Sequence, residues 1–343
     1  LDEYQLSHLG IRQLVMIGKH LRKHYIEKNN FIDKKFNRDE VKTYSIDNPV
    51  SIESLNYMLS GFYPNERIFP IKQICLIPDK CQKIEKVIKT NKRNYSKDIN
   101  DFAKKYSTHF RSLPEAYLSN YDNVFNFCDS VISAKAHNST HINGHIVKDC
   151  KQFMNNTYYE VLNDDNINKI LASRLIEQII NNIDNSFKCY DKCEKYIIYS
   201  ISSKDISAIL FFLNKHFKTM HHFPSFNSVI LIEIEEANLS TLVKIHFNDK
   251  HLITIDYMKF KDIIINNIYP VEYIDNYCLS DDTLIYQIIL LLLIVSIVII
   301  LGITIIRMLE QMFVKPESNT ILDHRSNERS FTYEFSKHYL YKN

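Results

Sequence analysis

Residues 40–64 read EVKTYSIDNPVSIESLNYMLSGFYP, and this stretch decides the fold that the sequence predicts. Residues 41–46 alternate as in a β-strand, and Asp47 and Asn48 then offer N-cap oxygens ahead of Pro49, which is favoured at the first helical position. The apolar residues that follow recur at helical spacing, namely Ile52, Leu55, Leu59 and Phe62. The stretch therefore predicts a strand that runs directly into a helix.

Residues 196–213, YIIYSISSKDISAILFFL, repeat this pattern. Residues 196–201 form a continuous apolar run, as expected of a strand buried on both faces, and Ser202 or Ser203 can cap the helix that follows. Strand-to-helix turns gather at the carboxyl ends of parallel strands, where open α/β sheets bind ligands, and a helix N-terminus there favours an anion. The sequence thus predicts an α/β fold with an anion site at these turns.

Further short motifs follow in an order and at spacings that one enzyme family shares. They are LSHLGIRQ at residues 6–13 for Leu-Thr-x-x-Gly-x-x-Gln, residues 40–47 for Glu-Ile-x-x-Arg-Ser-Thr-Asp, GFYP at residues 61–64 for Gly-Leu-Tyr-Pro, Tyr199-Ser200 before the position of a His-Asp pair, and residues 224–234 for a later Pro-x-x-x-Ser…Glu-Leu strand. The chain resembles the histidine acid phosphatases, particularly their membrane-anchored lysosomal and prostatic branch, over about residues 5–278.

The resemblance implies a doubly wound α/β core like that of phosphoglycerate mutases. The core would consist of residues 1–80 and 188–280, and a helical cap domain at residues 81–187 would be inserted between them. Helical periodicity at residues 171–183 agrees with such an insertion.

The chemistry of this family depends on charged side chains. A His in an Arg-His-Gly-x-Arg-x-Pro motif is the nucleophile and forms a phosphohistidine, arginines bind the phosphate, and an Asp protonates the leaving group. The sequence contains no such His motif. It begins at Leu1, within the stretch that should follow the motif, so we expect an N-terminal truncation.

Other motif positions are replaced within the sequence itself. Alignment places Tyr44 and Val50 where arginines belong, Ser202 at the family's His and Ser203 at its catalytic Asp. A register slipped by two residues would instead offer Lys204 as the cation and Asp205 as the acid, but it disturbs the match of the following helix.

These replacements bear on function through their energetic cost. A lost charged hydrogen bond costs roughly 1.5 to 3 kcal/mol, and every ~1.4 kcal/mol is tenfold in rate. We therefore expect a pseudophosphatase that binds a phosphorylated ligand or a protein partner and needs no cofactor. The alternative is a divergent active acid phosphatase that hydrolyses phosphomonoesters through a phosphohistidine supplied by the missing N-terminus.

Residues 284–306 contain no charged side chain and are long enough to span a bilayer as a helix. Asp281 and Asp282 precede this stretch, whereas Arg307 and Lys315 follow it. By the positive-inside tendency, the sequence predicts a single-pass type I membrane protein whose N-terminal domain is lumenal or extracellular.

This topology requires a signal peptide and leaves residues 307–343 as a cytosolic tail. In the tail, residues 317–322, ESNTIL, approximate an acidic dileucine sorting signal, although a chance match in a polar tail is the simpler interpretation. We expect a lysosomal or endosomal location, or the cell surface.

Seven cysteines in a lumenal domain predict disulfides. The resemblance implies a pair between Cys81 and Cys278, and it matches Cys128 to a family cysteine whose partner position here is Val229. Cys189 and Cys193 could pair locally or with Cys128 or Cys150. At least one cysteine stays unpaired within the monomer.

Other ligand classes have weaker signals. His137, His141 and His145 are spaced four apart, but Asn143-Gly144 interrupts the helix that a metal site would require, so we expect no metal. The net charge of +2 gives no indication of nucleic-acid binding. Sequons predict N-glycosylation at Asn94, Asn138, Asn155 and Asn238.

Overall fold

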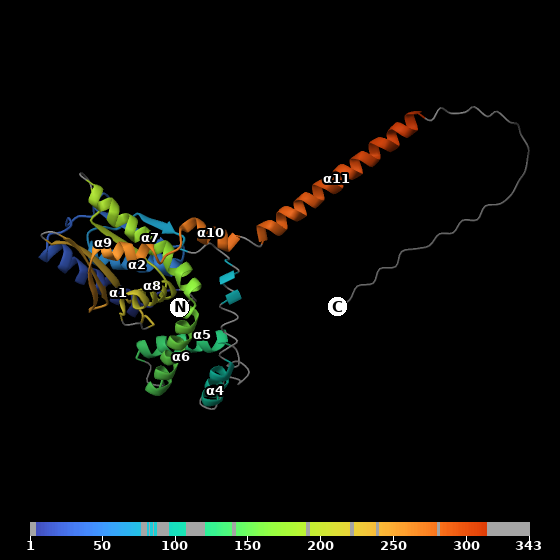
Figure 1. Ribbon diagram of the computed structural model, residues 1–343. Helices are drawn as coiled ribbons and strands as arrows, with labels where there is room; N and C mark the ends of the chain where they lie inside the picture. The colour runs from blue at the N-terminus through green and yellow to red at the C-terminus, as the bar shows by residue number, and fades with distance from the viewer. Residues whose placement is uncertain are drawn as a thin grey trace, which may run out of the picture. The chain divides into compact units, whose positions relative to one another are not determined.

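The computed structural model describes residues 5–76, 81, 83–84, 86–87, 96–107, 121–138, 142–189, 193–219, 223–237, 240–279 and 282–313. The chain divides into two compact units, Leu1–Asp281 and Asp282–Asn343 (Figure 1). The first unit holds both described sheets and the second holds one long helix.

The first sheet has three parallel strands in the order β2-β1-β3. These strands are β1 (Val41–Ile46), β2 (Ile71–Ile74) and β3 (Tyr196–Ser200). Tyr44 pairs with Tyr199 and Ser45 with Ser200 across β1 and β3. Alternate β1 residues are buried, as the sequence predicts for a strand. The two strand-to-helix segments are thus neighbours in one parallel sheet.

Two helices cover one face of this sheet, and they approach each other unusually closely. These are α1 (His8–Arg22), which continues as the π-helix η1 (Lys23–Lys28), and α2 (Pro49–Phe62). A Cβ atom at Gly18 would collide with the carbonyl of Met58, and one at Gly61 would collide with the carbonyl of Val15. Two of only five glycines therefore permit backbone contact between α1 and α2. Their shared cluster includes Leu14, Ile26, Leu55, Leu59 and Phe62.

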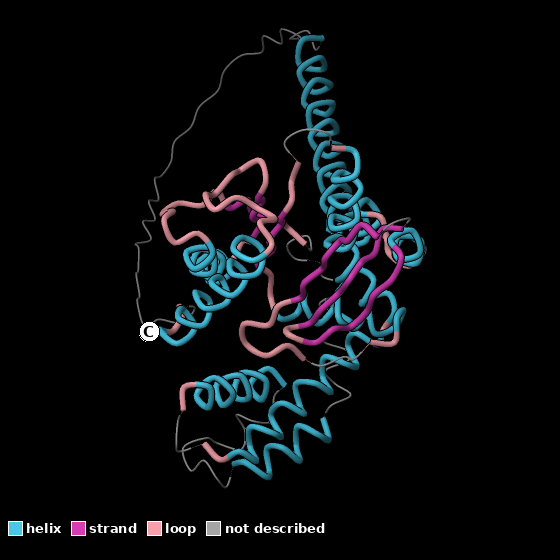
Figure 2. The backbone as a smooth tube through the Cα atoms, turned by 90° about the vertical axis from the view of Figure 1, so that its left-hand side faces the viewer, coloured by secondary structure: helices cyan, strands magenta, loops and turns pink. Residues whose placement is uncertain are grey.

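The second sheet is antiparallel, in the order β4-β5-β6. Its strands are β4 (Ile230–Ala237), β5 (Ser240–Phe247) and β6 (Lys250–Asp256). Figure 2 shows these three strands side by side.

The opposite helical layer packs against both sheets. It comprises α7 (Asp165–Lys188), α8 (Ser203–Phe217) and α9 (Tyr257–Ile265). One cluster joins these helices to Tyr199 of β3, Ile232 of β4 and Val243 of β5. On the other face, Leu231 of β4 packs with Ile198 of β3 against the α1–α2 layer. The two sheets therefore lie between the same two helical layers, which supports an α/β fold.

The facing margins of the two sheets have no backbone partners among the described residues. Within that part of the chain, β3 pairs only with β1, and β4 pairs only with β5. Tyr25 links the two margins: its ring lies 5.0 Å from that of Tyr196, and its hydroxyl donates to Glu233 Oε1 at 2.8 Å. The family resemblance implies one doubly wound core, whereas the described strands form two separate sheets with no ladder between β3 and β4.

Three helices have a core of their own. They are α4 (Ser96–Ser107), α5 (Tyr121–Ala136) and α6 (Gly144–Asn163), which lie together in Figure 1. Their cluster includes Phe102, Val124, Phe127, Cys150 and Phe153. By contrast, α7 packs on the sheets. Residues 81–187 thus contain a small helical cluster followed by a helix of the main layer.

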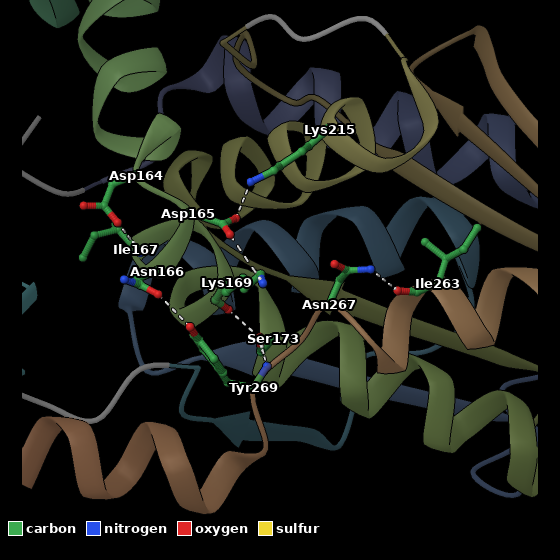
Figure 3. A network of polar contacts seen from close by, with 10 residues as sticks. All are labelled: Asp164, Asp165, Asn166, Ile167, Lys169, Ser173, Lys215, Ile263, Asn267 and Tyr269. Carbon is green, nitrogen blue, oxygen red and sulfur yellow. Dashed lines mark hydrogen bonds and ion pairs between the residues drawn. The ribbon is translucent and has the colours of Figure 1, made fainter.

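Polar contacts fix the start of α7 to its neighbours (Figure 3). Lys215 of α8 forms an ion pair with Asp165, and the Tyr269 hydroxyl donates to Asn166 Oδ1 at 2.6 Å. The Tyr269 amide also donates to Ser173 Oγ at 2.9 Å. These contacts hold α7 against the chain that leads into α10 (Val271–Leu279).

The second unit contains α11 (Asp282–Phe313), a 32-residue helix. Its segment Ile288–Leu309 has a mean hydropathy of 3.4, and none of it is buried. At about 1.5 Å per residue the segment matches the roughly 30 Å hydrocarbon core of a bilayer. The helix is thus long and apolar enough to span a membrane, beginning slightly later than residues 284–306. Residues 314–343, with most of the expected cytosolic tail and its ESNTIL stretch, lie outside the described residues.

Candidate functional site

The two strand-to-helix turns come together at one edge of the first sheet. β1 and β3 are parallel neighbours, so their carboxyl ends meet there and lead into α2 and α8. The hydroxyl of Ser200 donates to the carbonyl of Ser51 at 2.7 Å and so joins the end of β3 to the first turn of α2. Because α2 and α8 cover opposite faces, this edge is a topological switch point, where open α/β sheets bind ligands.

The donors at the start of α2 already have side-chain partners. Asn48 Oδ1 accepts from the amide of Val50 at 2.9 Å and from that of Ser51 at 3.3 Å. The adjacent Asp47 Oδ1 accepts from the side chain of Gln73 on β2 at 2.9 Å. An anion at this helix N-terminus would have to displace the Asn48 cap. Val50, in the first turn of α2, adds no charge.

The start of α8 forms a reciprocal capping box. The Asp205 amide donates to Ser202 Oγ at 3.3 Å, while Asp205 Oδ2 accepts from the Ser202 amide at 2.9 Å and from its hydroxyl at 2.6 Å. This settles the choice between two expected caps in favour of Ser202. Ser203 and Lys204 are exposed at the first turn.

Asp205 caps the start of α8, and its carboxyl group is also a weaker acid than an ordinary Asp. Burial raises the pKa of its carboxyl, although the hydrogen bonds from Ser202 and the charge of Lys204 oppose that effect. A raised pKa is a property that general acids require. However, Asp205 Oδ2 accepts hydrogen bonds from both the amide and the hydroxyl of Ser202, so this oxygen is already engaged at the start of α8.

Tyr44 lies within β1, two residues before the strand ends. Its ring stacks on that of Tyr199, with centroids 5.1 Å apart and planes at 15°. Tyr199 belongs to the cluster that α8 covers, so Tyr44 and the helix that Ser202 begins lie on the same side of the sheet. Burial, followed by the charge of Glu194, raises the pKa of Tyr44. Tyr44 therefore offers a neutral hydroxyl near the end of β1.

The cavities described in the structure lie away from these positions. One, of about 710 Å³, is lined by residues that include Asp184, Glu236, Asp256 and Tyr257. Another, of about 270 Å³, is lined by residues of α4 and α6, including Lys105 and Asp149. Neither includes Tyr44, Ser202 or Ser203 in its lining. Among the described residues, no group of three His, Cys, Asp or Glu side chains could hold a metal ion.

The expected long-range disulfide is confirmed. Cys81 and Cys278 are bonded with their Cα atoms 4.6 Å apart, although 197 positions separate them in sequence. Cys189 and Cys193 also form a disulfide, which resolves their open pairing as a local one. Cys128 and Cys150 lie outside both disulfides and are buried.

The sequons differ in their surroundings. Asn138 is exposed just beyond α5. Asn155 lies within α6, where its side-chain oxygen accepts from the Phe223 amide at 2.7 Å and the sequon's Thr157 is 1% exposed. This environment disfavours a glycan on Asn155. Asn94 and Asn238 lie outside the described residues.

The sequence predicts the two strand-to-helix turns, but it did not lead us to predict the hydrogen bond that joins the turns or the reciprocal bonding of Ser202 with Asp205. The bond from Ser200 to Ser51 spans 149 positions, so no local signal reveals it. The pairing of Ser202 with Asp205 does have a signal, because the Ser-x-x-Asp spacing is that of a capping box.

Comparison with known proteins identifies the fold. No protein-family model matches the sequence, and no curated protein matches it. The structure is similar to that of Klebsiella sp. ASR1 phytase, with a TM-score of 0.60 and 8% identity over 77% of this chain and 86% of that one. For Hafnia alvei phytase in complex with myo-inositol hexakis sulphate, the TM-score is 0.61 and the identity 9%, over 81% and 89% of the two chains. Citrobacter braakii phytase gives 0.57 and 10%, over 82% and 91%.

Proposed function

We propose that this protein is a catalytically impaired member of the histidine acid phosphatases, a pseudophosphatase that binds a phosphorylated ligand or a protein partner. Bacterial phytases belong to that family, and the chain shares their fold. The ligand would lie at the switch point, at the carboxyl ends of β1 and β3. We further propose a single-pass type I anchor through α11, with the folded domain lumenal or extracellular in a lysosome, an endosome or at the cell surface.

The observation that carries this proposal is the chemistry at the two turns. By the sequence resemblance, Tyr44 stands at the position of a phosphate-binding Arg, and Ser202 and Ser203 stand at the positions of the His and the Asp. In the structure Tyr44 is stacked on Tyr199 and Ser202 caps α8. Some of the backbone amides near the switch point already donate hydrogen bonds to the side chains of Asn48 and Ser202. Neutral hydroxyls can donate to a phosphate, but without the charge assistance that strengthens Arg–phosphate contacts about twofold.

Titration with inorganic phosphate, monitored by phosphorus NMR, tests whether the carboxyl ends of β1 and β3 bind an anion. We expect the unmodified protein to bind weakly and Tyr44→Arg to bind at least about tenfold more tightly, since a charged hydrogen bond contributes roughly 1.5 to 3 kcal/mol. Tyr44→Phe is the matched control, because it keeps the stacked ring and removes only the hydroxyl. Equal affinity in all three proteins would contradict a phosphate site at Tyr44 and favour a protein partner.

The open margins of β3 and β4 favour a second candidate function. One further strand between these sheets would supply backbone partners for both margins, whose outward amides and carbonyls otherwise have none among the described residues. A segment ahead of Leu1 could contribute such a strand and carry a nucleophilic His, which would make the protein a divergent active acid phosphatase. Leu6, near the first described residue, packs in the same cluster as Ile198 and Leu231.

The upstream coding sequence distinguishes the two candidates. An Arg-His-Gly-x-Arg-x-Pro motif within an apolar strand would favour the active enzyme, and a strand without a His would favour the pseudophosphatase.

A further inference from the structure

The helices α5 and α6 pack together through two apolar stripes, and each stripe has a cysteine near its middle. The stripe of α5 consists of Val124, Phe127, Cys128 and Val131, and that of α6 consists of Ile146, Cys150, Phe153 and Met154. Cys128 and Cys150 are both 0% exposed. They occupy the centre of a small core that is separate from the sheets.

The two thiols contact each other. A hydrogen bond with Cys150, followed by burial, raises the pKa of the Cys128 thiol. Both side chains belong to the buried cluster that α5 and α6 share. A disulfide between them would therefore join two side chains that are already neighbours.

The other cysteines indicate the redox setting. Cys81–Cys278 and Cys189–Cys193 are disulfides, and such bonds persist in oxidising compartments. Of the seven cysteines, this leaves Cys75 together with the contacting pair. Cys75 is exposed near the end of β2, outside the α4–α6 cluster.

We propose that Cys128 and Cys150 form a third disulfide, which links α5 to α6 within the helical cluster. The oxidant is a small-molecule or protein disulfide of the secretory pathway. One cysteine thiolate attacks the donor disulfide and releases a donor thiol. The second cysteine thiolate then displaces the other donor thiol from the mixed disulfide. The two cysteines thus lose two electrons and two protons, and the donor disulfide becomes two thiols.

Burial dictates when this bond forms. The thiolate is the attacking species, and a buried thiol with a raised pKa supplies very little of it. The bond therefore forms during folding, before the helical cluster closes. Once the cluster has closed, the bond is also shielded from reductants.

Alkylation of the full-length protein tests this inference. The protein is made in a eukaryotic secretory host, denatured without reductant, treated with N-ethylmaleimide and deglycosylated, and its mass is measured. We expect one adduct without reduction and seven after reduction. Peptide mapping should show a cross-linked pair that contains Cys128 and Cys150. Three adducts, or a cross-link from either residue to Cys75, would overturn the inference.

Two variants check the assignment. Cys150→Ser should raise the adduct count without reduction from one to two, because it releases the Cys128 thiol. Cys75→Ser, the matched control, should lower the count to zero and leave the cross-linked peptide unchanged. If Cys150→Ser is not secreted, the adduct count and cross-linked peptide of the unmodified protein decide the question alone.

Discussion

Ser202 and Asp205 cap the same helix reciprocally: the amide of each donates to the side chain of the other, at 2.9 Å from Ser202 and 3.3 Å from Asp205. The family resemblance predicts that Ser202 and Ser203 stand where histidine acid phosphatases have a His and an Asp. In the structure the side chain of Ser202 caps the start of α8, and Ser203 is exposed in its first turn.

Removal of this capping box should weaken the fold. Asp205→Ala should lower the free energy of unfolding by about 1 kcal/mol, within the usual range of roughly 0.5 to 2 for a lost cap. Asp205→Asn keeps a side-chain acceptor and should cost less. Urea denaturation monitored by circular dichroism measures the free energy of unfolding of both variants, and Lys204→Ala, at an exposed position, is the control. If Asp205→Ala proves as stable as Lys204→Ala, the capping box contributes nothing to stability.

Close contact between α1 and α2 makes their glycines sensitive to substitution. Gly18→Ala would place a methyl group against the carbonyl of Met58, which lies in an adjacent helix and cannot move aside. Overpacking of this kind typically costs about 1 to 3 kcal/mol. Thermal unfolding should show a clear loss for Gly18→Ala. At Gly144, where a Cβ meets nothing within 4 Å, the same change should leave stability almost unaltered.

The ion pair between Glu40 and Lys195, with Nζ and Oε1 2.6 Å apart, should make stability depend on pH. The hydrogen bond from Lys195 lowers the pKa of Glu40 below its ordinary value in the folded state. Its stabilisation is therefore complete above the unfolded pKa of about 4.3 and is lost as pH falls through the folded pKa.

Glu40→Gln measures that contribution. The variant should be less stable than the unmodified protein at pH 7, by at most about 1 kcal/mol because Lys195 is partly exposed. The difference should disappear once the pH falls below the lowered pKa of Glu40. Lys195→Gln should behave similarly. A difference that stays constant with pH would show that the Glu40 carboxylate gains nothing from the pair.

Local signals explain what the sequence could predict. The alternation of β1, the Asn48 cap and the apolar stripe of α2 all fall within residues 41–62, and β3 with α8 repeats the pattern. The long disulfide between Cys81 and Cys278 came from family resemblance, since nothing local links residues 197 positions apart.

Other features depend on contacts that the sequence does not reveal. The antiparallel sheet β4–β6 is set by strand pairing and by packing against α8 and α9. The contact of Ser200 with Ser51 depends on which strands become neighbours. At the site, the sequence resemblance predicts that Tyr44, Ser202 and Ser203 replace charged residues, but the stacking of Tyr44 on Tyr199 is visible only in the pairing of β1 with β3.

Hydrolysis of p-nitrophenyl phosphate between about pH 4 and 6 tests most directly whether the protein is catalytically impaired, as we propose. The protein, expressed from its full coding sequence in a eukaryotic secretory host, should be assayed beside a variant that carries both Tyr44→Arg and Ser203→Asp. We expect the unmodified protein to hydrolyse no more substrate than a mock preparation, and the double variant to exceed it if the expressed protein contains a nucleophilic His. Turnover by the unmodified protein at an ordinary enzyme rate, about 1 per second or more, would contradict the account.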